Sequence, residues 1–299
     1  MRILQCSLGV QTDIRDALQK YGEVIYWNWS GQDRVFNQKI RELVDQHKPD
    51  LVWMQIQTPG ILNEQTAQYI GSKAKVVNWT GDCRSPLPRW FLEVGRQIHL
   101  TLFTNMPDVE ELRRYDVKTE YLQIGFPDKI FTPEGDKREE AEIVFFGNNV
   151  GGFPMSKFRQ DMVDALAKRY GNRFKAYGIN LGNGFGGEFN QHEEAKIYRG
   201  AKIGINCSHF NYSRYSSDRI FRLMGTGVMC LSHNYNDIDK EFEVGTHLDI
   251  WNTIEGLFDK IDYYLEHEEQ RKNIGRQGSE HVHKNCKWDN RIDQLMKMI

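Results

Sequence analysis

The chain has 299 residues, of which 39% are hydrophobic and 27% are charged, a mixture that can build hydrophobic cores and argues against wholesale disorder. This length fits two α/β domains of ordinary size. The 39 basic and 41 acidic residues nearly cancel, and the net charge of −2 does not favour a strongly basic nucleic-acid or membrane-surface protein, although a local basic groove stays possible.

In the first part of the chain, short apolar runs alternate with segments of helical periodicity. Strands that alternate with helices of ten to fifteen residues indicate βαβ units and a parallel sheet. The pattern therefore predicts a Rossmann-like domain over residues 1–126. The predicted strands cover 2–7, 23–29, 51–57, 75–79, 99–105 and 118–124, and the predicted helices cover 11–21, 33–47, 63–71 and 107–115.

Residues 125–137 break this alternation with prolines, glycines and charges, and they are expected to link two domains. A second Rossmann-like domain is predicted over residues 138–299, with a helical tail from about 254 and a last helix, around 288–299, that crosses back toward the first domain. Its strands are predicted at 142–146, 173–177, 202–207 and 228–232, and its helices at 155–170, 191–199 and 218–224. The fold class is α/β with two tandem domains, and the cleft between them is the expected site.

Glycines follow the first strand of the second domain. Gly147 and Asn148 open the segment Gly147-Asn-Asn-Val-Gly-Gly152 before a helix, where backbone N–H groups and a helix N-terminus favour a phosphate. The segment is neither a G-x-G-x-x-G signature nor a P-loop, and a flexible turn explains it equally well. A second glycine-rich segment, residues 181–187, is better explained as an ordinary surface loop.

The most informative motif is Ser217-Asp-Arg219-Ile-Phe-Arg222, which begins a helix after the strand at 202–207. A capping hydroxyl, an arginine and a helix N-terminus together bind a diphosphate well. Taken alone, however, the motif fits a capped amphipathic helix with a solvated arginine better than a binding site.

Asp82 lies just beyond the predicted strand at 75–79 in the first domain. At the carboxyl end of a strand, its carboxylate is placed to accept a proton from an acceptor hydroxyl. Capping a turn is the commoner role of an aspartate in that position.

Several motifs of the second half together resemble the C-terminal domain of CgeB-like glycosyltransferases, in the glycosyltransferase group 1 clan with the GT-B fold. These motifs are the segment 203–208, the Ser217–Phe221 motif, Gly225-Thr-Gly227, the segment 251–265 and Trp288. The resemblance spans about 142–295. It implies a glycosyltransferase, of the hexosyl or pentosyl Leloir type, that takes a nucleotide sugar as donor. It also implies that Gly147, Asn148 and Arg159 face the donor phosphates, that Tyr177 and Gly178 lie near the base, and that Ser217 and Arg219 hold the diphosphate.

Arg222 departs from the family pattern, in which a glutamate at this place contacts the donor ribose. An arginine cannot accept hydrogen bonds from hydroxyl groups. The donor is then held differently, or it carries extra negative charge, or the chain is a non-catalytic nucleotide-sugar-binding protein. A GT-B nucleotide-sugar epimerase is a further alternative, but the several acid and base groups that it needs are not evident in the sequence.

The five cysteines show no C-x-x-C pair or zinc spacing, so no metal site is expected from them. The resemblance to GT-B enzymes implies that no cofactor is required. The donor is expected to be a UDP-sugar, and the acceptor a saccharide or a modified base in phage DNA. No signal peptide and no apolar run of about 20 residues is evident, which favours a cytoplasmic protein without an integral membrane segment.

Overall fold

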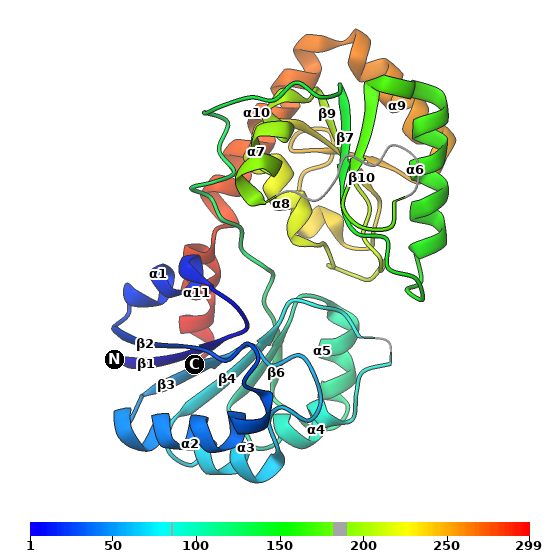
Figure 1. Ribbon diagram of the computed structural model, residues 1–299. Helices are drawn as coiled ribbons and strands as arrows, with labels where there is room; N and C mark the ends of the chain where they lie inside the picture. The colour runs from blue at the N-terminus through cyan, green and yellow to red at the C-terminus, as the bar shows by residue number, and fades with distance from the viewer. Residues whose placement is uncertain (85, 182–189) are drawn as a thin grey trace. The chain divides into compact units, whose positions relative to one another are not determined.

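The computed structural model describes residues 1–84, 86–181 and 190–299. The chain divides into two compact units: unit 1 contains Met1–Ile124 and Trp288–Ile299, and unit 2 contains Gly125–Lys287. Each unit is a parallel sheet with helices on both faces (Figure 1). Residues 125–137, expected to be a linker, are grouped with unit 2.

Unit 1 contains a six-stranded sheet of order β2-β1-β3-β4-β5-β6, in which all neighbouring strands are parallel. All four residues of β3 are buried, as expected for strands that are covered on both faces. The strands are β1 (Arg2–Ser7), β2 (Glu23–Asn28), β3 (Leu51–Met54), β4 (Lys75–Thr80), β5 (Leu100–Phe103) and β6 (Thr119–Tyr121). The helices are α1 (Thr12–Gln19), the 3-10 helix η1 (Asp33–Val35), α2 (Phe36–His47), α3 (Glu64–Gly71), α4 (Trp90–Gly95), α5 (Met106–Arg113) and α11 (Trp288–Met298).

Two apolar clusters pack on the two faces of this sheet. Helices α2, α3, α4 and α5 contribute to one cluster, and α1 and α11 contribute to the other. In the second cluster, the Trp288 ring meets the Trp79 ring edge-on at 5.1 Å, and Arg291 Nε donates to the Ile124 carbonyl at 3.2 Å. The last helix therefore groups with unit 1, whereas the sequence-based division placed residues 138–299 together in the second domain.

Asparagine side chains begin several of the helices. Asn63 accepts from the Thr66 N–H at 2.8 Å, Asn105 from the Asp108 N–H at 2.9 Å, and Asn190 from the Glu193 N–H at 3.1 Å. Such caps satisfy backbone donors that the first turn leaves free, and each contributes about 1 kcal/mol. They fix where α3, α5 and the helix α7 (Gln191–Gly200) begin, close to the predicted starts.

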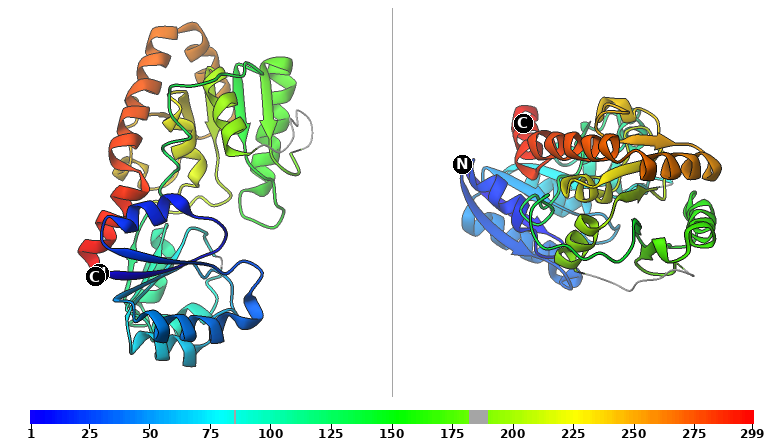
Figure 2. Two further views of the ribbon diagram at one scale, coloured as in Figure 1. Left: turned by 60° about the vertical axis from the view of Figure 1, so that its left-hand side comes forward. Right: turned by 90° about the horizontal axis from the view of Figure 1, so that it is seen from above.

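Unit 2 contains a five-stranded parallel sheet of order β11-β10-β9-β7-β8. Its strands are β7 (Ile143–Phe146), β8 (Phe174–Tyr177), β9 (Ile203–Asn206), β10 (Met229–His233) and β11 (Asp249–Trp251). Its helices are α6 (Ser156–Tyr170), α7 (Gln191–Gly200), α8 (Asp218–Gly225), α9 (Ile254–Glu266), α10 (Glu268–Asn285) and the 3-10 helices η2 (Gly171–Arg173) and η3 (Ile238–Lys240). Helix α10 has 18 residues and is drawn in orange in Figure 2.

Helices α6 and α9 supply the main apolar cluster on one face of this sheet. Helices α7 and α8 lie on the other face (Figure 1). Close packing of α10 there requires glycine, because a Cβ at Gly275 would lie 2.4 Å from the Gly227 carbonyl oxygen, and one at Gly278 would lie 2.2 Å from the His247 carbonyl oxygen.

Apart from short 3-10 helices, two elements within the described residues were not predicted from the periodicity, α4 and β11. Helix α4 is only six residues long, and β11 only three, so neither repeats an apolar pattern often enough to be recognised. The strand predicted over 51–57 ends at Met54, since the polar residues beyond it leave the sheet. The described helices include none that is both long and apolar enough to cross a membrane.

Candidate functional site

The strand order of unit 2 reverses at β7. From β7 the chain continues to β8 on one side and later to β9 on the other, and the connecting helices α6 and α7 lie on opposite faces (Figure 1). In open parallel sheets this arrangement leaves a crevice at the carboxyl ends of the two diverging strands, where ligands bind. The segments that follow β7 and β9 begin with Gly147 and Cys207.

A cavity of about 470 Å³ opens at this place. It is lined by the ends of β7 and β8, the first turns of α8 and one residue of α7. The lining residues are Phe146, Gly147, Asn148, Tyr177, Gly178, Glu194, Asp218, Arg219 and Arg222. Of the residues that the sequence singled out, the structure brings Gly147, Asn148, Tyr177, Gly178, Arg219 and Arg222 together here, while Phe146, Glu194 and Asp218 were not expected.

Glycine is required in both loops of this wall. A Cβ at Gly147, which has a φ of +157°, would lie 2.7 Å from Arg219 Nη2 and 2.9 Å from Arg159 Nη2. A Cβ at Gly178, with a φ of +129°, would lie 2.5 Å from the Gly147 carbonyl oxygen. The two loops are tied by the Gly147 N–H, which donates to Tyr177 O at 2.8 Å, and by the Ile179 N–H, which donates to Asn148 Oδ1 at 2.9 Å. The Asn148 side chain thus fixes the loops.

Two arginines meet behind and beside Gly147. Arg159 is fully buried on α6, donates to the carbonyl oxygens of Cys207 and, at 2.8 Å, Asn148, and leaves its Nε without a partner. Arg219, in the first turn of α8, is 9% exposed and donates to Asn206 Oδ1 at 3.2 Å and to Cys207 O at 3.0 Å. Across the described parts of the chain, neither guanidinium group forms an ion pair with a carboxylate.

These two cations are held in an unfavourable environment. Burial, with the nearby charge of Arg219, lowers the pKa of Arg159 to about 9, so the group is still charged at neutral pH. A buried charge without a counter-ion costs several kcal/mol, as an order of magnitude. The Phe145 ring, whose centroid is 5.2 Å from one guanidinium carbon and 5.1 Å from the other, offsets only part of that cost. An anion bound beside Gly147 would relieve the rest.

Arg222 differs from these two arginines because carboxylates hold it on both sides. Its Nη2 lies 2.6 Å from Asp218 Oδ2, and its Nη1 donates to Glu194 Oε2 at 3.3 Å. Burial raises the pKa of the Glu194 carboxyl, an effect that the charge of Arg222 opposes. Arg222 therefore adds no unbalanced positive charge to the cavity.

Aromatic rings form the wall near β8. Phe146 stacks on Tyr177 with ring centroids 4.5 Å apart and an interplanar angle of 22°. Tyr177 is buried, and its hydroxyl donates to Glu140 Oε2 at 3.3 Å, outside the cavity lining. The ring of Tyr177, and not its hydroxyl, supports the cavity wall.

Two polar groups near the arginines lack partners within the described residues. Ser217 occupies the N-cap position of α8 without capping it, and its Oγ is buried and forms no hydrogen bond. His209, in the loop after β9, has a buried Nε2 without a partner. Burial and the charges of Arg159 and Arg219 lower the pKa of His209 to about 4, so that its ring is neutral near neutral pH. Nothing in the local sequence pattern marks His209.

Asp82 lies in unit 1, two residues beyond β4. Its side chain is 62% exposed and lies 3.5 Å from Arg84 Nη2, which also donates to the Gln57 carbonyl at 3.0 Å. The buried carboxyl of that region is Asp108, whose pKa burial raises to about 6. Asp108 accepts from Asn105 Nδ2 at 2.8 Å.

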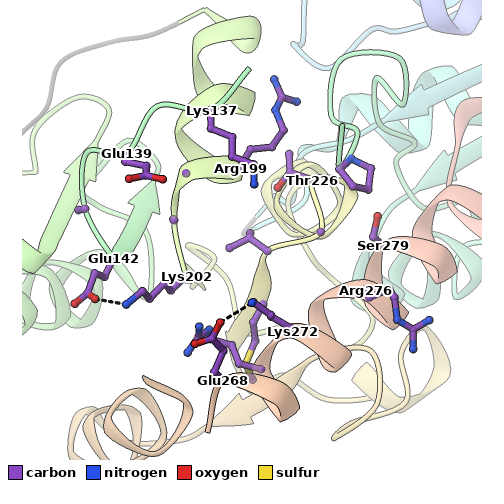
Figure 3. Close-up of a pocket in the computed structure, with 18 of the residues that line it drawn as sticks. Lys137, Glu139, Glu142, Arg199, Lys202, Thr226, Glu268, Lys272, Arg276 and Ser279 are labelled. Carbon is purple, nitrogen blue, oxygen red and sulfur yellow. Dashed lines mark hydrogen bonds and ion pairs between the residues drawn. The ribbon is translucent and has the colours of Figure 1, made fainter. Parts of the chain in front are cut away.

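Unit 2 also contains a larger cavity, of about 1040 Å³ (Figure 3). Its charged side chains largely neutralise one another: Lys202 lies 2.5 Å from Glu142, Lys272 lies 2.5 Å from Glu268, and Arg276 lies 2.7 Å from Glu280. None of the sequence-predicted site residues lines it. The smaller cavity is therefore the better candidate for an anionic ligand.

The described residues include no group of three or more His, Cys, Asp or Glu side chains that could hold a metal ion. All five cysteines are buried, and none of them forms a disulfide within the described residues. The glycine-rich segment 181–187 lies outside the described residues except for Leu181.

Residues 159–297 match the sequence model of a family described as glycosyl transferase-like. The match covers less than half of the chain, lies mostly in unit 2, and begins at Arg159. It includes α8 with Ser217, Arg219 and Arg222. No curated protein matches the sequence.

Solved structures resemble the whole chain. The Alr3699/HepE protein of Anabaena, in complex with UDP and glucose, is 11% identical with a TM-score of 0.70, and each chain is covered to 100%. Sucrose-phosphate synthase of Thermosynechococcus elongatus is 13% identical with a TM-score of 0.71, covering 100% of this chain and 98% of that one. A glycosyltransferase of Rickettsia africae is 13% identical with a TM-score of 0.67, covering 99% and 97%.

At such low identities these likenesses show the fold alone. The predicted fold class, two Rossmann-like parallel sheets with interleaved helices of the GT-B type, is confirmed. The likeness to glycosyl transferase-like sequences concerns residues 159–297, and the likeness of fold concerns the whole chain.

Proposed function

We propose that the chain is a glycosyltransferase that binds a UDP-sugar in the cavity beside Gly147 and transfers the sugar to an acceptor hydroxyl. One observation carries the proposal: Arg159 and Arg219 are buried at the switch point of a parallel sheet, next to a glycine loop, and neither has a carboxylate partner among the described residues. The match to glycosyl transferase-like sequences and the UDP complexes of HepE support the choice of ligand.

In the proposed complex, Arg219, the Ser217 hydroxyl and the N-terminus of α8 hold the diphosphate, with Arg159 behind the loop. Cleavage of the bond between the sugar and the diphosphate leaves negative charge on the leaving group. Fixed cations and a helix N-terminus stabilise such developing charge without reorganising. The observations that support these roles are the unpaired Ser217 Oγ and the missing carboxylate partners of the arginines within the described chain. No cofactor enters this scheme.

Asp82 is the proposed general base for the acceptor hydroxyl. Its exposed carboxylate at the carboxyl end of a unit 1 strand supports that role. The same proposal includes the CgeB-like subgroup, the hexosyl or pentosyl type of transferase and a cytoplasmic location. The proposed acceptor is a saccharide or a modified DNA base, and assays with each acceptor class decide between these two.

The test is isothermal calorimetry with UDP and UDP-glucose, on the wild type and on Arg219→Gln. Loss of a charge-assisted contact to phosphate is expected to weaken binding by about 10- to 100-fold. Arg276→Gln, which removes an exposed arginine of unit 2 outside this cavity, is the matched control and should bind normally. A wild type that binds neither nucleotide would overturn the proposal.

A transfer assay with labelled donor sugars then separates catalysis from binding alone. Transfer to an acceptor supports the glycosyltransferase. Binding without transfer to any acceptor favours the non-catalytic nucleotide-sugar-binding alternative, and free epimerised donor without acceptor indicates the epimerase.

A further inference from the structure

The contacts of Arg222 set the charge of one corner of the cavity. The Arg222 side chain lines the cavity, yet Asp218 and Glu194 bind it at 2.6 Å and 3.3 Å. One cation between two carboxylates leaves this corner with a net charge of about −1. Such a corner repels an additional phosphate group and favours a neutral group that donates hydrogen bonds.

The two carboxylates of this corner are not equivalent. The Asp218 side chain is 37% exposed and lies in the first turn of α8, one residue from Arg219. The Glu194 side chain is only 9% exposed and projects from α7, an element that contributes no other residue to the cavity. A desolvated carboxylate forms stronger hydrogen bonds to a ligand than an exposed one. Arg222 Nη1 donates to Glu194 Oε2, and the Tyr198 hydroxyl also interacts with this carboxylate, whose remaining lone pairs are left for a ligand.

The order of groups along the cavity fits a nucleotide. Arg219 stands at the anion-binding end, and the stacked rings of Phe146 and Tyr177 form a flat apolar wall. Arg222 lies three residues beyond Arg219 on α8, and residues at that spacing are neighbours on a helix surface. Glu194, held by Arg222, therefore lies next to the anion-binding end, where the pentose of a bound nucleoside diphosphate has its hydroxyl groups.

Resting on the proposed function, we infer that Glu194 reads the ribose hydroxyls of the donor nucleotide, and that Arg222 positions this carboxylate and does not contact phosphate. The chain thereby selects ribonucleotides over deoxyribonucleotides. The donor is then held differently from the family pattern, because α7 supplies the carboxylate that accepts from the ribose.

The test compares the affinities of UDP, 2′-deoxy-UDP and 3′-deoxy-UDP by calorimetry. The wild type should bind UDP about tenfold or more tightly than at least one deoxy analogue, as expected for a charge-assisted hydrogen bond. In Glu194→Gln the affinity for UDP should fall, while the affinity for that analogue should change little. The ratio between the affinities for UDP and for the deoxy analogue should therefore fall to a few-fold.

Glu193→Gln is the matched control, since Glu193 precedes Glu194 on α7 but pairs with Lys196 at 2.8 Å and does not line the cavity. It should keep the full wild-type preference. Equal losses for UDP and its analogues in Glu194→Gln would overturn the inference, because they would mean that Glu194 only supports Arg222.

The wild type alone also decides the question if Glu194→Gln does not fold. A wild type that binds UDP and both deoxy analogues equally well would overturn the inference and leave the proposed function intact. A wild type that binds no uridine nucleotide would overturn both.

Discussion

At the scale of single residues, Gly147 matters because the two arginines lie where its side chain would be. A Cβ there would lie 2.7 Å from Arg219 Nη2, closer than real contacts allow, and the φ of +157° disfavours other residues. We expect Gly147→Ala to displace Arg219, to weaken UDP binding by about tenfold or more, and to destabilise the protein by roughly 1–3 kcal/mol. Calorimetry and urea unfolding measure the two effects.

Gly151→Ala is the control for this substitution, because a Cβ at Gly151 would meet no atom within 4 Å. It should leave affinity and stability close to those of the wild type. Normal UDP binding by Gly147→Ala would show that the loop can move away from the arginines, which contradicts a loop that the Asn148 side chain holds in place.

Asp82 gives a second prediction at this scale. Because its side chain is 62% exposed and its contact with Arg84 is 3.5 Å long, Asp82→Asn should change the melting temperature little. As the proposed base, it should lower the turnover number by roughly 10²–10⁴-fold with donor affinity unchanged. Asp116→Asn, at an exposed turn before β6, is the control. A less stable Asp82→Asn protein with normal turnover would assign Asp82 to turn capping.

Single residues also show how far the sequence could predict the site. Gly147, Asn148, Arg219 and Arg222 were singled out because they follow strands or begin a helix, and parallel strands bring such positions to one edge. Glu194 was missed because it lies within α7 and reaches the cavity only through packing of α7 against α8. The neutralisation of Arg222 by a residue 28 positions away has no signal in local spacing.

At the scale of elements, α11 completes a sheet face that α1 covers only in part. Trp288 is 6% exposed and contacts Trp79, so Trp288→Ala should destabilise unit 1 by roughly 3–5 kcal/mol. Hydrogen exchange would locate the loss in β1, β3 and β4, with the amides of β7 and β9 protected as in the wild type. Lys297→Ala, at an exposed position of the same helix, is the control. Equal loss of protection in both units would contradict this assignment.

The strands were predictable because a parallel sheet buries both faces, and continuous apolar runs such as Ile143–Phe146 mark it. The starts of helices with an asparagine cap were predictable because the capping residue itself marks them in the sequence. The strand ends were not predictable from the apolar pattern. The chain leaves the sheet near side-chain contacts such as the hydrogen bond from Thr80 Oγ1 to Gln57 Oε1 at 2.9 Å, and the periodicity of apolar residues carries no information about such contacts.

At the scale of the whole molecule, one buried titrating group in each unit gives opposite responses to pH. The pKa of Asp108 is about 6 in the folded unit 1 against 3.8 for the ordinary group, so its contribution to stability is lost as the pH rises from about 4 to 6. The pKa of His209 is about 4 against 6.5, so its contribution is lost as the pH falls from about 6.5 to 4.

Melting temperatures between pH 4 and 7 test this pair of signs. Relative to the wild type, Asp108→Asn should gain stability as the pH rises through this window, and His209→Asn should gain stability as it falls. If the melting temperatures of both variants, relative to the wild type, changed in the same direction with pH, the opposite pH responses assigned to Asp108 and His209 would be contradicted.

The division of the chain also has a consequence for the order of folding during synthesis. Unit 2 is one continuous stretch, Gly125–Lys287, inserted into unit 1, which needs α11 to cover the face that contains Trp53 and Trp79. A ribosome releases the whole of unit 2 before it releases Trp288, and domains fold largely as units while the chain emerges. Unit 2 can therefore finish folding first, although its synthesis begins later. Until α11 docks, unit 1 is incomplete, and the apolar face that this helix covers stays exposed.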